Sequence, residues 1–175
     1  WRYSAKCGDN DVSVTGWAIM ALKSAELSEL NFPREQAYQG AINWLNEATN
    51  PSGYSRVGYN ARDTGKVYVP GKNEPFDHHE SMSAVAVMSR IFMQKKKNEP
   101  TLNAVHMLIQ DLPEWKQYKI DFYYWYYTSL ALFQYDGPDG PMWKKWNEPM
   151  KNTIVSNQHT GKDGCRNGSW DSDAD

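Results

Sequence analysis

Residues 15–20, Thr-Gly-Trp-Ala-Ile-Met, decide the fold, because related segments occur at two later places in the chain. Residues 83–88 read Ser-Ala-Val-Ala-Val-Met, and residues 127–132 read Tyr-Thr-Ser-Leu-Ala-Leu. A second pattern follows the first two copies, with Ala-Ile-Asn-Trp-Leu at 41–45 and Ala-Val-His-Met-Leu at 104–108. Apolar residues at this spacing predict helices. A two-helix unit that recurs along the chain predicts stacked helical hairpins.

The helical pattern extends outward from these segments to cover most of the chain. Helices are predicted at residues 12–29, 33–49, 80–95, 101–111, 121–135 and 142–158. Residues 54–77 break the pattern, and apolar residues on both sides of a Gly-containing turn predict a small β-hairpin near residues 54–70. The predicted fold class is therefore all-α, with three helical hairpins and this insert. A length of 175 residues suits one domain, 1–175.

Composition excludes several classes of protein. Aromatic residues make up 14% of the chain, with eight Trp and eleven Tyr. The net charge is only −2, whereas a nucleic-acid-binding protein needs a basic face. The longest apolar runs are far shorter than the roughly 20 residues of a transmembrane segment. Because the chain begins at Trp1, without Met or a signal peptide, we expect a piece of a longer protein.

Two segments look like the QW motif of terpenoid cyclases. The first is residues 154–158, ending in Gln158, followed after a stretched loop by Gly168-Ser169-Trp170. The second comprises Gly40-Ala41, Trp44-Leu45, Thr49 and Gly53-Tyr54, with Thr in place of Gln. Residues 11–22 are similar to the inner-helix segments that precede such repeats.

The chain thus resembles the terpenoid cyclase and protein prenyltransferase superfamily. It looks most like the bacterial, planctomycete-type proteins known only as prenyltransferase/squalene-oxidase-repeat proteins. This resemblance implies a partial α/α toroid of three hairpins. It also implies that the remaining toroid repeats, or a homodimer partner, cover the edges of the partial ring. The motif indicates a fold more than an activity, since one fold serves several chemistries.

Aligning the three inner helices predicts a cluster of polar residues. Asp11, His79 and Tyr123 each stand nine residues before the last apolar residue of the repeated segment. In stacked hairpins such positions fall at the same end of the bundle, where helix N-termini add partial positive charge. A small-molecule site needs such convergent polar groups. The residues expected around this mouth are Asp9, Asp11, His78, His79, Glu80, Asp121, Tyr123 and Tyr124.

Two interpretations of the mouth stay open. Asp9, Asp11 and Asp121 stand where N-caps are expected, and capping alone would explain them. Asp9-Asn10-Asp11-Val12 also half resembles the acid motif of squalene–hopene cyclases, which implies Asp9, Asp11 and His79 as candidate catalytic residues. The adjacent pair His78-His79 does not supply a zinc ligand set, so neither a metal nor a cofactor is expected.

The aromatic run at 122–127 offers a similar choice. Tyr123, Tyr126 and Tyr127 fall on one helix face, and Phe122 and Trp125 on another. These rings either pack in the core or line a cavity for an apolar small molecule. Trp17 and Trp44 occupy repeat positions and are expected to pack within the scaffold.

Cys7 and Cys165 stand near opposite ends of the chain, each in a Gly-rich polar loop. They allow one disulfide, which would indicate an extracytoplasmic location. An arc of three hairpins could equally hold them apart, so both states stay open.

These patterns favour one function and leave two alternatives. The favoured hypothesis is a non-catalytic repeat domain that binds a ligand or protein in its concavity, because neither an acid motif nor a zinc triad is complete. The first alternative is a terpenoid-cyclase-like enzyme acting on a polyisoprenoid. The second is a glycan-binding or glycan-processing α/α toroid, since exposed Trp beside carboxylates suits sugars.

Overall fold

The computed structural model describes residues 1–4, 7–52, 55–62, 80–94, 98–117, 119–161 and 164–172. These residues form α1 (Val12–Leu27), α2 (Arg34–Ala48), α3 (Ser81–Gln94), α4 (Glu99–Leu108), α5 (Phe122–Asp136), α6 (Pro141–Ser156) and the short 3-10 helix η1 (Gly164–Arg166). The all-α prediction is confirmed, and the ends of the six α-helices lie within three residues of the predicted ones. Pro149 lies inside a continuous α6.

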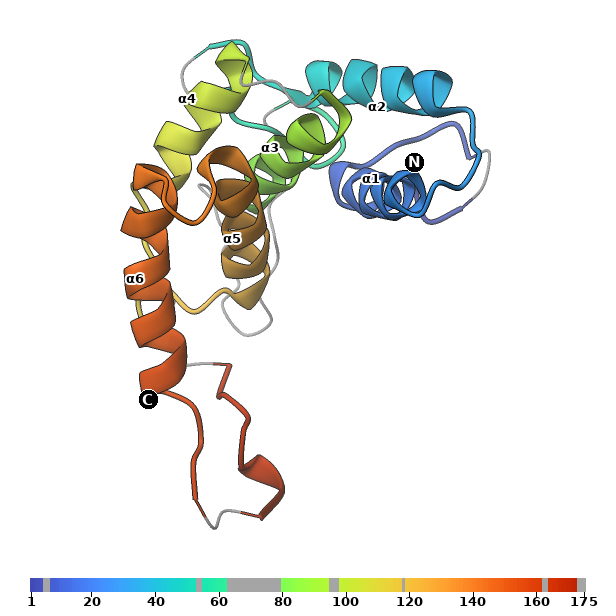
Figure 1. Ribbon diagram of the computed structural model, residues 1–175. Helices are drawn as coiled ribbons and strands as arrows, with labels where there is room; N and C mark the ends of the chain where they lie inside the picture. Colours follow the sequence, from blue (N-terminus) through green and yellow to red (C-terminus); the bar gives the residue numbers. More distant parts are fainter. Residues whose placement is uncertain are drawn as a thin grey trace.

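The helices form three hairpins side by side. Helix α3 packs between α1 and α5, and each odd-numbered helix packs against the even-numbered helix that follows it. Figure 1 shows α1, α3 and α5 on the inside of a bend, with α2, α4 and α6 on the outside. The loop after α6 runs away from the helices.

Small residues allow α3 to occupy the centre. Every residue from Ser81 to Arg90 is buried, which is typical of a helix surrounded on all sides. On α1, Gly16 faces Val85 so closely that a Cβ placed on Gly16 would overlap Cγ1 of Val85. The absence of a side chain at Gly16 therefore sets the distance between α1 and α3.

The third hairpin is held by buried aromatic side chains. Trp125 of α5 and Trp146 of α6 are among the largest fully buried side chains. Trp146 donates its Nε1 hydrogen to Ser129 Oγ at 2.9 Å, and its ring meets the edge of Tyr124 at 5.6 Å. A buried indole needs a partner for its N–H, and Ser129 provides it.

The segment between α2 and α3 is only partly described. Residues 53–54 and 63–79 lie outside the described residues, so the β-hairpin expected near 54–70 stays a prediction. Within residues 55–62, Val57 forms an isolated antiparallel bridge with Thr49. The backbone N–H of Val57 also donates to Ser83 Oγ at 3.1 Å. This bridge ties the end of α2 to the start of α3.

Cys7 and Cys165 are free and exposed, so the candidate disulfide is not formed. Cys165 lies in η1, on the loop beyond α6, whereas Cys7 belongs to the segment before α1 (Figure 1). The row of hairpins separates the two loops. Within the described parts of the chain, no helix is both long enough and apolar enough to cross a membrane.

Replacing two helical glycines by alanine tests the packing of α1 on α3. Gly16→Ala should lower the free energy of unfolding by about 1–2 kcal/mol, because overpacking outweighs the better helix propensity of Ala. Gly40 in α2 has nothing within 4 Å of an added Cβ. Gly40→Ala should therefore raise stability by about 0.5–1 kcal/mol. Urea unfolding measures both, and equal effects would contradict the close approach of α1 to α3.

Candidate functional site

Two of the carboxylates expected at the mouth cap helices. Asp11 is the N-cap of α1, where Oδ1 accepts from the backbone N–H of Val14 at 2.7 Å and from Ser13 Oγ at 2.8 Å. Asp121 is the N-cap of α5 and accepts from the backbone N–H of Tyr124 at 2.9 Å. The capping interpretation is confirmed for both residues.

Asp11 nevertheless has an unusual environment for a cap. Its side chain is fully buried, at 0% exposure, and Oδ2 has no hydrogen-bond partner. The neighbouring Tyr59 phenol has its pKa raised to about 12, mainly by burial, and the negative charge of Asp11 acts in the same direction. A buried carboxylate with one free oxygen is the feature that a catalytic interpretation of Asp11 would require.

Glu80 anchors the start of α3 and is also buried. Its Oε1 forms an ion pair with Arg56 Nε at 2.6 Å, and its Oε2 accepts from Ser83 Oγ at 3.0 Å. Both oxygens are therefore engaged within the protein. His78 and His79, the other members of this predicted trio, lie outside the described residues.

The Tyr124 side chain is buried against the end of α4. Burial raises the pKa of the Tyr124 phenol, and the negative charges of Asp111, Glu80 and Asp121 act in the same direction. The Tyr124 hydroxyl donates to the backbone oxygen of Leu108 at 3.0 Å. Tyr124 is thus a core residue that lies between the starts of α3 and α5.

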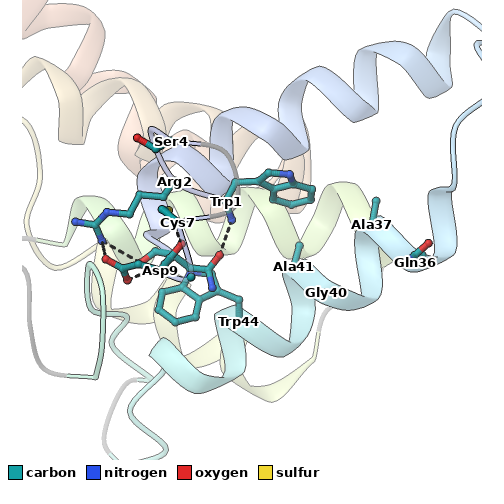
Figure 2. A pocket seen from close by; sticks show the side chains of 12 residues that line it. Trp1, Arg2, Ser4, Cys7, Asp9, Gln36, Ala37, Gly40, Ala41 and Trp44 are labelled. Atoms are coloured by element: carbon teal, nitrogen blue, oxygen red, sulfur yellow. Dashed lines mark hydrogen bonds and ion pairs between the residues drawn. The ribbon is translucent and has the colours of Figure 1, made fainter.

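Asp9 does not cap a helix. Its carboxylate forms an ion pair with Arg2 at 2.6 Å and accepts from the backbone N–H of Asn10 at 2.8 Å. Asp9 lines a cavity of about 570 Å³ between the N-terminal segment and α2, and Trp1 and Trp44 form part of the same wall (Figure 2). The structure therefore places Asp9 at a cavity, whereas Asp11 is buried at the start of α1.

Trp17 is on the surface, which corrects the expectation that it packs within the scaffold. Its side chain is 52% exposed, and Nε1 donates a hydrogen bond to the hydroxyl of Tyr127. A helical repeat fixes a position along the helix but not the direction of each side chain. Here the neighbouring helix is α5, whose Tyr127 hydroxyl accepts the hydrogen bond but leaves about half of the Trp17 side chain exposed.

The rings around this hydrogen bond form one surface, called the aromatic face below. Tyr127 is buried, and its ring lies 4.7 Å from that of Tyr123 and 5.1 Å from that of Tyr126. Tyr126 is 54% exposed and Tyr123 is partly exposed. The prediction that these three tyrosines share a helix face is confirmed. The aromatic face thus comprises Trp17, Tyr123, Tyr126 and Tyr127.

The other side of the aromatic run packs on Trp115, with Trp125 buried and Phe122 still 39% exposed. Phe122 and Trp125 meet edge to face at 5.5 Å, and Trp115 lies beside both. Core packing therefore explains Trp125 and Tyr124, while Trp17, Tyr123 and Tyr126 remain at the surface.

The loop after α6 contains a polar cluster that the sequence analysis missed. His159 Nε2 lies 2.9 Å from Asp171 Oδ2, and Arg166 donates to Asp171 Oδ1 at 2.8 Å. Desolvation acts to raise the pKa of Asp171, but hydrogen bonds from His159 and Arg166 outweigh it and lower that pKa. The QW-like segment could have indicated this cluster, because His159 and Arg166 lie in the loop between its two parts, which joins residue 158 to residue 168.

Among the described residues, no group of three or more His, Cys, Asp or Glu side chains could hold a metal ion. Comparison with known proteins finds no matching family model, no matching curated protein and no matching solved structure. The function must therefore be argued from the residues themselves.

Substitutions of Asp11 separate capping from other roles. Asp11→Ala should lower the free energy of unfolding by about 1–2 kcal/mol, because the cap of α1 is lost. Asp11→Asn should be milder, because the amide oxygen can still accept from Val14. Asp121→Ala and Asp121→Asn provide the matched pair at α5. If Asp11→Asn destabilised as much as Asp11→Ala in chemical unfolding, the carboxylate charge would matter beyond capping.

Ionisation of tyrosine tests the packing of the aromatic run. Burial raises the pKa of Tyr123, Tyr124 and Tyr127, whereas an unfolded tyrosine ionises near pH 10. Above that pH the unfolded state binds fewer protons than the folded state, so stability should fall as pH rises. Absorbance at 295 nm should show a late-titrating group of tyrosines, and Tyr127→Phe should remove one. Simultaneous ionisation of all tyrosines near pH 10 while the protein is folded would contradict the burial.

Proposed function

We propose that this chain is a non-catalytic binding domain, a segment of stacked helical hairpins of the terpenoid cyclase and prenyltransferase toroid type. The aromatic face is its contact surface. The hydrogen bond from Trp17 to Tyr127 carries this proposal, because it joins the exposed rings of α1 and α5 into one surface. Tryptophan and tyrosine are the residues most enriched in the central, energetically dominant part of protein interfaces.

The state of the carboxylates supports a non-catalytic role. A general acid must lie within hydrogen-bond reach of the group that it protonates. Asp11 is fully buried and caps α1, Asp121 caps α5, and Glu80 is paired with Arg56. Each therefore has a structural role that accounts for its presence.

Contacts within the QW-like segment support the toroid type. The side-chain amide of Gln158 donates to the backbone oxygen of Gly168 at 3.0 Å, and Trp170 Nε1 donates to the backbone oxygen of Ile154 at 2.7 Å. The residues on which the resemblance rests thus contact one another across the long loop. The placement of odd helices inside and even helices outside the bend is also the arrangement that stacked hairpins of a toroid would have (Figure 1).

The large exposed area of the chain favours a second copy of the same chain as the partner of the aromatic face. The chain exposes 10,435 Å², whereas a compact monomer of its mass, 20.2 kDa, exposes about 8,800 Å². The surplus is larger than the roughly 800 Å² that each partner buries in an interface of standard size. The net charge of −2 opposes self-association only weakly.

One observation favours glycan binding as a second candidate function. The cavity beside α2 combines the rings of Trp1 and Trp44 with the charged pair Arg2 and Asp9 (Figure 2). An apolar wall with a few polar groups is the usual form of a small-molecule site, and sugar rings stack on indoles.

Sedimentation equilibrium over a range of concentrations tests the main proposal. The wild-type chain should form a dimer. Trp17→Ala and Tyr126→Ala should each weaken it by tenfold or more, about 1.4 kcal/mol, because each removes an exposed ring from the aromatic face. Phe133→Ala is the matched control, since Phe133 is an exposed ring of α5 that packs on Trp143 instead.

A monomer at all concentrations, or an equal effect of Phe133→Ala, would contradict the proposal. Two ligand titrations followed by tryptophan fluorescence distinguish the alternatives. Saturable binding of geranylgeraniol that depends on Trp17 would favour the polyisoprenoid hypothesis. Saturable binding of cellohexaose that depends on Trp44 would favour glycan binding.

A further inference from the structure

Arg90 of α3 is a buried cation whose hydrogen-bond partners among the described residues are neutral. Arg90 is only 3% exposed, and this burial lowers the pKa of its guanidinium. Nη1 donates to Asn46 Oδ1 at 2.8 Å, and Nη2 donates to Thr49 Oγ1 at 3.0 Å. Both acceptors are neutral, and among the residues that the structure describes no carboxylate forms an ion pair with Arg90.

This situation is energetically unfavourable for an isolated chain. Taking a charge out of water is costly unless an opposite charge compensates it, and buried charges in proteins are normally paired. Arginine presents several N–H donors in a fork that matches the two oxygens of a carboxylate or phosphate. The guanidinium of Arg90 is therefore suited to an anion that the described residues do not supply.

Arg90 also lines a cavity that could admit such an anion. The cavity has a volume of about 280 Å³ and lies between the end of α2, the turn after it and the start of α4. Its wall includes hydrogen-bond donors from Ser55, Asn103 and Arg62. Arg62 is fixed at this place because its Nε donates to the backbone oxygen of Glu47 at 3.0 Å.

We propose that this cavity binds a small monocarboxylate whose two oxygens accept hydrogen bonds from Arg90. The charged residues of the wall set the preference for a single negative charge. Among the described residues that line the cavity, Arg90 and Arg62 are positive and Glu99 is negative, so these residues together carry a charge of +1. One carboxylate balances this charge, whereas a phosphate dianion would exceed it and would be repelled by Glu99.

The site is independent of the proposed function. The aromatic face is built from α1 and α5 on the inside of the bend (Figure 1). This cavity is built from the end of α2, the segment after it and the start of α4, together with Arg90 of α3. Failure of the dimer experiment would leave this proposal untouched, and the reverse also holds.

Nuclear magnetic resonance of arginine side chains in the wild-type chain tests the proposal directly. Sodium propionate should shift the Nε–Hε signal of Arg90 in a saturable manner, while sodium chloride at equal ionic strength should not. The signal of Arg34, an exposed arginine already paired with Glu26, is the internal control and should not move. Absence of a saturable shift, or an equal shift with chloride, would overturn the proposal.

Two substitutions of exposed wall residues test the charge argument without disturbing the core. Arg62→Gln should weaken propionate binding by about tenfold, because one of two favourable charges is removed. Glu99→Gln should strengthen binding of inorganic phosphate by a similar factor. Arg90→Met should abolish propionate binding if the variant folds. If it does not fold, the titration of the wild-type chain decides whether propionate binds at Arg90. Wild-type binding of phosphate more tightly than propionate would refute the preference for a monocarboxylate.

Discussion

The close packing of α1 and α5 on α3 is the constraint on which the other features depend. A helix enclosed between two others must carry small or compact side chains at the contacts, and Gly16 against Val85 is the tightest case. This approach also places Trp17 within hydrogen-bond distance of Tyr127. If α1 lay farther from α3, the aromatic rings of the first and third hairpins would not form one surface.

Helix initiation explains most of the polar residues at one end of the bundle. The first backbone N–H groups of a helix have no partner within the helix, and a side-chain oxygen at the cap stabilises a protein by about 1 kcal/mol. Asp11 and Asp121 meet this need for α1 and α5, while Glu80 and Ser83 link the start of α3 to Arg56 and Val57. Aligned hairpins therefore gather carboxylates at one end for structural reasons, and such a gathering alone is weak evidence for catalysis.

Local patterns predicted the helices well because helix formation depends on residues a few positions apart. The shared face of Tyr123, Tyr126 and Tyr127 follows from the helical period and was predicted for the same reason. The exposure of Trp17 was not predictable, because it depends on how α1 is rotated against α5. The environment of Arg90 was equally hidden, since its partner Asn46 lies 44 residues earlier in the chain. Nothing local to residue 90 indicates a buried guanidinium whose described partners are neutral.

Helix α3 packs against α1, which carries Trp17 of the aromatic face, and it also contributes Arg90 to the cavity beside α2. Its contact with α1 is apolar and close, whereas its contact with α2 includes the polar hydrogen bonds from Arg90 to Asn46 and Thr49. A ligand that binds only the folded state stabilises that state by mass action. An anion at Arg90 would therefore strengthen the weaker, polar attachment of the first hairpin to the second. The position of Trp17 against α5 rests instead on the apolar contact of α1 with α3, so the two surfaces depend on different attachments of α3.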